Sequence, residues 1–99
     1  MAEIFTKRGR FEIVYEILSL CRVSVQKTRI LYRCNLSYEQ LLKYIEYLIG
    51  KDLLMTFKNE GKDFYQITEN GKAFIEGYEQ IQGLLYPKIR KSNYRNRRK

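Results

Sequence analysis

The chain has 99 residues, of which 44% are apolar, enough for one small domain with a single core. It carries 19 Lys and Arg against 11 Asp and Glu, so its formal net charge is +8. No apolar run approaches the ~18 residues that span a bilayer, and the N-terminal sequence MAEIFTKRGR lacks the apolar segment of a secretory signal. We therefore expect a cytoplasmic protein that does not contact a membrane.

The two cysteines, Cys21 and Cys34, have a spacing that fits no zinc motif, and the chain has no histidine to complete one. Both are expected to be buried or half-buried thiols, with a disulfide between them as the alternative. The sequence also lacks a Gly-rich phosphate loop and a nucleophile beside a base. We expect a binding protein without metal, cofactor or small-molecule ligand, and not an enzyme.

The excess of positive charge is concentrated at the C-terminus. Residues 1–33 hold seven Lys or Arg and three acids, whereas residues 34–87 hold five and eight, so their balances are +4 and −3. Residues 88–99, KIRKSNYRNRRK, add seven cations and no acid. Such a segment cannot bury a core, so we expect a disordered basic tail at 87–99 after a folded domain at 1–86. The tail would neutralise phosphates through Lys88, Arg90, Lys91, Arg95, Arg97 and Arg98, unless it is only a solubilising or inert end.

In chain order, a first helix is expected at residues 8–22. Its apolar stripe consists of Phe11, Val14, Ile17, Leu18 and Cys21, with Ile13 at the edge. Arg8 and Arg10 lie at its start, where the helix dipole disfavours cations. Either an external anion binds these two arginines or they are only solvated.

Residues 24–54 are expected to form a helix-turn-helix. Its first helix would span residues 26–33, and a polar turn containing Asn35 would lead to a second helix opening at Ser37. The Ser37 hydroxyl can accept the Gln40 backbone N–H while the Gln40 side chain reaches back, which is a capping box. In the second helix the core side would hold Tyr38, Leu41, Leu42, Ile45, Leu48 and Ile49, with Tyr44 at the boundary and Tyr47 outside.

Two β-like runs follow, at residues 53–57 and 64–67, on either side of an Asn59-Glu60-Gly61-Lys62 turn. They would form a hairpin, with Gly61 at a position of positive φ. Tyr65 and Ile67 would point inward, while Phe64 and Gln66 would face out. A helix-turn-helix followed by such a hairpin is a winged helix, mainly α with a small β-hairpin.

Thr68 is expected to cap a last helix at residues 69–86. Apolar residues at spacings of four, three and four form a seam two heptads long, consisting of Phe74, Tyr78, Ile81 and Leu85. We expect this seam to be the interface of a homodimer. Packing of the last helix on the first helix of the same chain is the alternative.

The run KTRILYRCNLSYEQLLKYIEYLIGKDLL, followed by FYQITENGKAFIEGYEQIQGLL, resembles an archaeal winged-helix family. That family includes the small ten-kilodalton DNA-binding chromatin proteins and many predicted transcription regulators. The resemblance covers roughly residues 11–85. This sequence departs from the family pattern at two places: Cys34 stands at the position of a small residue, and a basic tail after Pro87 replaces a long coiled coil. It implies a winged helix with a C-terminal dimerisation helix that binds double-stranded DNA, as a transcription regulator or as a chromatin-type architectural protein.

In a helix-turn-helix the second helix enters the major groove and the first crosses the phosphate backbone. The second helix would present Ser37, Glu39, Gln40, Lys43 and Tyr47 to the bases. The backbone contacts are expected from Lys27, Thr28 and Arg29 on the first helix, and from Lys58 and Lys62 on the wing. Alternatively, Arg29 or Arg33 forms an ion pair with Glu12 or Glu16.

Two other functions stay open. Winged helices also dock on proteins, and the −3 balance of residues 34–87 favours such a module. RNA binding is the other, because Tyr94 lies among arginines in the tail and such segments can fold on RNA.

Overall fold

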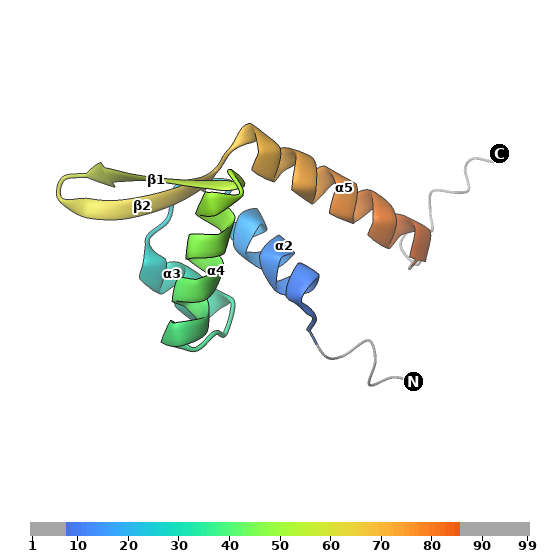
Figure 1. The fold of residues 1–99 in the computed structure, drawn as a ribbon, viewed down its shortest axis with the longest axis horizontal. Helices are drawn as coiled ribbons and strands as arrows, with labels where there is room; N and C mark the ends of the chain where they lie inside the picture. The colour runs from blue at the N-terminus through green and yellow to red at the C-terminus, as the bar shows by residue number, and fades with distance from the viewer. Residues whose placement is uncertain (1–7, 86–99) are drawn as a thin grey trace.

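The computed structural model describes residues 8–85 (Figure 1). Its elements are α2 (Arg10–Leu20), α3 (Lys27–Arg33), α4 (Tyr38–Gly50), β1 (Leu54–Asn59), β2 (Lys62–Ile67) and α5 (Glu69–Leu85). The predicted fold, mainly helical with one small antiparallel hairpin, is confirmed. The predicted basic tail at 87–99 lies outside the described residues.

One apolar core joins the helices to the hairpin. It consists of Ile13, Val14, Ile17, Leu18, Cys21, Val25, Ile30, Cys34, Leu36, Leu41, Ile45, Leu48, Leu54, Tyr65, Ile67 and Ile75. No charged side chain of the described residues is buried. The fold therefore rests on apolar burial, and its charged groups stay at the surface, where they can meet a partner.

Four residues predicted on the core side are exposed instead. Phe11 is 68% exposed and Tyr38 is 57% exposed, while Leu42 and Ile49 also face solvent. Tyr38 lies in the first turn of α4, and Phe11, in the first turn of α2, lines an open apolar groove beside α5 and is not covered by it. The buried stripe of α4 is narrower than predicted, because only one side of this helix is covered.

Both cysteines are buried and free, so the prediction of buried thiols is confirmed. Burial, followed by the proximity of Cys34, raises the pKa of the Cys21 thiol to about 12. Burial also raises the pKa of Cys34, and Glu16 adds to this effect. Because a neutral thiol is a poor nucleophile, these groups act as small apolar side chains of the core.

The hairpin has the predicted inward and outward residues. Phe57 pairs with Phe64 in the antiparallel register, and Tyr65 and Ile67 are buried. Glu60 and Gly61, at φ values of 53° and 79°, form a two-residue turn of the kind that matches the twist of paired strands. Val25, which lies outside the hairpin, extends the sheet by pairing with Tyr65.

A hydrogen-bonded junction connects the end of α4 to the start of α5. The Thr68 hydroxyl accepts the Gly71 backbone N–H at 3.0 Å, which confirms the predicted cap, and donates to the Asp52 carbonyl at 2.6 Å. The Asn70 amide donates to the Asp52 carboxylate at 3.0 Å. Asp52 itself lies in the left-handed region, at φ 59°. The direction in which α5 leaves the sheet is thereby fixed.

α5 packs against α2 with contacts that reach Glu79, and its last turns project beyond α2 (Figure 1). The Tyr78 ring stacks on Tyr15 with centroids 4.6 Å apart, and Phe74 packs against the core. The Tyr15 hydroxyl donates to Glu79 at 2.7 Å, and this bond chiefly raises the pKa of Tyr15. Two of the four predicted seam residues, Phe74 and Tyr78, thus contact their own chain.

Gly71 tests the junction, because a Cβ at this position would lie 2.3 Å from the Leu53 carbonyl oxygen. We expect Gly71→Ala to lower the free energy of unfolding by about 1–3 kcal/mol, since the overlap is with backbone. Gly83→Ala, in the same helix with no neighbouring atom within 4 Å, is the control and should be neutral or stabilising by up to about 1 kcal/mol. Urea denaturation measures both; equal stability of the two variants would contradict the close approach.

Candidate nucleic-acid interface

The capping box at the start of α4 has formed as predicted. The Gln40 backbone N–H donates to the Ser37 hydroxyl, and the Ser37 N–H donates to the Gln40 side-chain oxygen, both at 3.1 Å. Leu41, Ile45 and Leu48 anchor the helix in the core. The face away from the core exposes Glu39, Gln40, Lys43, Glu46 and Tyr47.

The cap restricts what Gln40 can do. A bidentate contact to adenine needs the amide oxygen as acceptor and the amide nitrogen as donor. In this structure the oxygen accepts the Ser37 N–H with one of its two lone pairs, so the cap fixes the orientation in which the amide presents its remaining acceptor and its donor. Lys43, by contrast, makes no side-chain hydrogen bond or ion pair within residues 8–85.

Further along α4, Tyr47 is exposed as predicted, and the Lys51 ammonium lies 5.8 Å from the centre of its ring. This distance is within the range of a cation–π contact. The Lys51 charge therefore lies beside Tyr47, at the opposite end of the exposed face from Ser37.

On α3, Thr28 and Arg29 are exposed and Lys27 is half-buried. The alternative of ion pairs from Arg29 or Arg33 to α2 is wrong. Glu16 pairs with Arg8 instead, and Glu12 accepts the Gly9 backbone N–H at 2.7 Å. Both α3 arginines thus keep their guanidinium groups available to a ligand.

On the wing, Lys58 and Asp63 face each other across the two strands and form an ion pair of 2.8 Å. The hydrogen bond to Asp63 raises the pKa of Lys58, and the same bond lowers the pKa of Asp63. Lys62 is exposed and has no such partner among the described residues. Of the two predicted wing contacts, Lys62 has the less compensated charge.

A family model described as winged helix-turn-helix matches residues 7–85. The chain belongs to this family. MJ0287, an uncharacterized protein of Methanocaldococcus jannaschii, is 39% identical over 83 residues, which are 83% of this chain and 81% of the relative. MJ0290 of the same organism is 32% identical over 82% of this chain, which spans 37% of that longer protein.

Among solved structures, Sso10a-2, a DNA-binding protein from Sulfolobus solfataricus, matches with a TM-score of 0.68 and 29% identity. The match covers 93% of this chain and 100% of that chain. A MarR variant from E. coli in complex with operator DNA matches with a TM-score of 0.64 and 14% identity, over 83% of this chain and 59% of that one, and shares the fold. The predicted resemblance to the archaeal winged-helix family is confirmed.

No helix within residues 8–85 is long and apolar enough to cross a bilayer. In the same part of the chain, no three His, Cys, Asp or Glu side chains gather in a way that could hold a metal ion.

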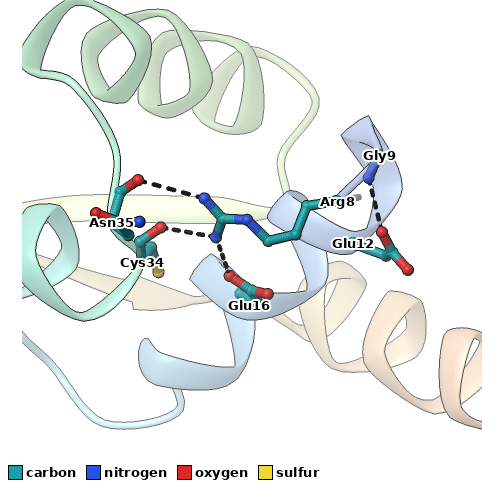
Figure 2. Close-up of polar contacts among 6 residues, drawn as sticks. All are labelled: Arg8, Gly9, Glu12, Glu16, Cys34 and Asn35. Carbon is teal, nitrogen blue, oxygen red and sulfur yellow. Dashed lines mark hydrogen bonds and ion pairs between the residues drawn. The ribbon is translucent and has the colours of Figure 1, made fainter. Parts of the chain in front are cut away.

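Arg8 has a structural role that no sequence pattern predicted (Figure 2). One guanidinium nitrogen donates to the Glu16 carboxylate at 2.5 Å and to the Cys34 carbonyl at 2.7 Å, while the other reaches the Asn35 carbonyl at 3.3 Å. The two carbonyls belong to the turn between α3 and α4, where Asn35 has φ 54°. The Arg8 guanidinium is therefore engaged within its own chain, where it supports the helix-turn-helix turn.

The Arg8 guanidinium lies at the C-terminal end of α3, where the helix dipole makes a positive charge favourable. No local pattern announces this contact, since Arg8 and Cys34 are 26 residues apart in the chain.

We expect Arg8→Gln to lower the free energy of unfolding by about 1 kcal/mol, because two carbonyls and Glu16 would be deprived of a charged donor at a partly exposed site. Arg10→Gln is the matched control, since Arg10 is exposed and makes no side-chain hydrogen bond within residues 8–85. Chemical denaturation of both variants measures the difference. Equal destabilisation would mean that the Arg8 hydrogen bonds contribute nothing beyond net charge.

Proposed function

We propose that this winged-helix protein binds double-stranded DNA with α4 in the major groove. The observation that carries the proposal is the exposed polar face of α4, which presents Gln40 and Lys43 from a helix anchored on its other side. Such a rigid helix is what a major groove accommodates. The likeness to the DNA-binding protein Sso10a-2 supports the same conclusion.

The phosphate backbone contacts would come from three other parts of the chain. Thr28 and Arg29 lie near the start of α3, Lys62 lies at the wing tip, and residues 88–99 supply seven more cations. Each neutralised phosphate would steepen the salt dependence of binding. We infer a binding protein in the cytoplasm, and not an enzyme.

The side chains on α4 favour a regulator over a purely architectural protein. An architectural protein needs chiefly phosphate contacts, whereas the exposed face of α4 mixes Glu39 with Gln40 and Lys43. Glu39 would repel phosphate but can accept a hydrogen bond from cytosine. A surface of this composition is better suited to hydrogen bonds with base edges than to contacts with the phosphate backbone of DNA.

Lys43→Ala tests this proposal, with duplexes selected from a random-sequence pool as probes. We expect the variant to lower the preference for a selected duplex over a scrambled one by roughly 1–3 kcal/mol, as for removal of a good base contact. Lys72→Ala is the control, because it removes the same charge from α5, where Lys72 pairs only with Glu69. Anisotropy titrations at fixed salt measure both.

If Lys43→Ala lowered the affinity equally for all duplexes, the result would favour the architectural role. If it left the affinity for DNA unchanged, the result would favour protein docking. Binding of RNA in preference to every duplex would contradict the proposal.

We also propose a homodimer formed through α5. An apolar groove of about 390 Å³ lies between the start of α2 and α5, lined by Phe11, Ala73, Phe74, Gly77, Tyr78 and Ile81. Ile81 is 56% exposed, and Leu84 and Leu85 beyond it are also open to solvent. Small monomers rarely leave such a strip uncovered. A two-fold axis would also present two copies of α4 to half-sites about one DNA turn apart.

Ile81→Asp should convert the dimer to a folded monomer that binds DNA more weakly, since Ile81 is exposed within one chain and a monomer offers only one copy of α4 to the duplex. Gln80→Asp is the control, because it adds a carboxylate at an exposed neighbouring position that does not line the groove. Sedimentation velocity at micromolar concentration measures the mass. An unmodified protein that sediments as a monomer would refute the dimer.

A further inference from the structure

The hairpin has a second, outer face that neither the core nor α4 uses. Successive strand residues alternate between faces, so the burial of Leu54, Tyr65 and Ile67 assigns Phe57 and Phe64 to the opposite side. These two residues pair directly across the strands, with ring centroids 6.0 Å apart and planes inclined by 18°. Phe57 is 38% exposed, and Met55 on the same face is exposed as well.

A groove of about 610 Å³ continues from this face towards α3. Its lining includes Gln26, Thr28, Arg29, Tyr32, Arg33 and Phe64. Phe64 belongs both to the groove and to the aromatic pair, so the two surfaces are continuous. Among the lining residues none comes from α4, which makes this surface distinct from the major-groove face.

The groove combines positive charge with an open aromatic ring. Arg29 and Arg33 make no ion pair or side-chain hydrogen bond within the described residues, and no acidic side chain lines the groove. Tyr32 is 78% exposed. An anion that also carries flat apolar groups would complement both features.

Single-stranded nucleic acid has this chemistry. In a duplex the phosphates are accessible, but the base faces are stacked inside and cannot contact exposed aromatic rings. A single strand presents both its phosphates and its base faces. We propose that the outer face of the wing and the α3 groove bind a single-stranded segment of DNA or RNA. Its bases stack on Tyr32 and on the Phe57–Phe64 pair, and its phosphates contact Arg33 and also Arg29, which the proposed duplex would share.

The test uses the full chain and three fluorescent probes, namely a dT 12-mer, an rU 12-mer and a 20-base-pair duplex. Tyr32→Ala and Phe57→Thr should each weaken single-strand binding roughly fivefold or more, as expected when one base no longer stacks. Their duplex affinity should not change. Lys43→Ala should show the reverse pattern, which separates this site from the proposed duplex site.

The charge contribution is tested by Arg33→Gln. Removing one phosphate-binding cation should reduce the salt dependence of single-strand binding by about 0.7 in the log–log slope. Arg10→Gln is the matched control and should leave the slope unchanged. Tighter binding of rU than dT, or the reverse, identifies the sugar that the site prefers.

Photocrosslinking of the unmodified protein to a 5-iodouracil oligonucleotide locates the site without any substitution. Crosslinks at Tyr32, Phe57 or Phe64 support the proposal. Crosslinks confined to α4 or to residues 88–99 would overturn it. Equal weakening of duplex and single-strand binding in Tyr32→Ala and Phe57→Thr would also overturn it, because the groove would then hold the backbone of a duplex.

Discussion

The position of α4 depends on a narrow apolar contact. Leu41, Ile45 and Leu48 follow one line along the helix, and each buried side chain of this kind contributes about 1.5–3 kcal/mol. Because the stripe is narrow and only Tyr44 packs partly beside it, most of the helix surface is left to solvent, including apolar residues such as Leu42. A helix attached along one line could still pivot about it, so the contacts at its two ends matter. The Ser37–Gln40 box orders the first turn, and Arg8 holds the turn that precedes it.

The far end of α4 is connected to the wing and to α5 through two adjacent residues, Asp52 and Leu53. The Asp52 carbonyl oxygen accepts a hydrogen bond from the Thr68 hydroxyl, and the Asp52 carboxylate accepts one from the Asn70 amide. Close packing of Gly71 on the Leu53 carbonyl leaves no space for a side chain there. α4, the hairpin and α5 are therefore oriented relative to one another by a few adjacent contacts.

The sequence predicts features that depend on neighbours in the chain. The box at Ser37, the cap at Thr68 and the positive φ at Gly61 all follow from residue types at fixed spacing, and the structure has each of them. Helical periodicity gives an angle around the axis, but it does not say which part of that face another element covers. Phe11 and Tyr38 are therefore exposed although their angles assign them to the core side. Partners distant in the chain leave no periodic signal, which is why the role of Arg8 could not be predicted. The predicted DNA-contacting residues and the dimer interface remain predictions.

In the proposed complex Gln40 would both cap α4 and face the bases, which bears on how selective the α4 face is. Its amide oxygen accepts the Ser37 N–H with one of its two lone pairs, so the second lone pair and the amide nitrogen remain for a ligand. A bidentate contact to adenine is then compatible with the cap only where the capped orientation of the amide also faces the base. Any other orientation would cost the cap hydrogen bond, with a net contribution of about 0.5–1.5 kcal/mol. That cost offsets much of the roughly 1–3 kcal/mol that a bidentate contact supplies. Lys43 is only a donor, so it favours acceptor atoms such as those of guanine, and Glu39 is an exposed acceptor beside it. The proposed duplex face would therefore discriminate modestly among sequences, less than a strict operator-binding protein and more than a protein indifferent to sequence.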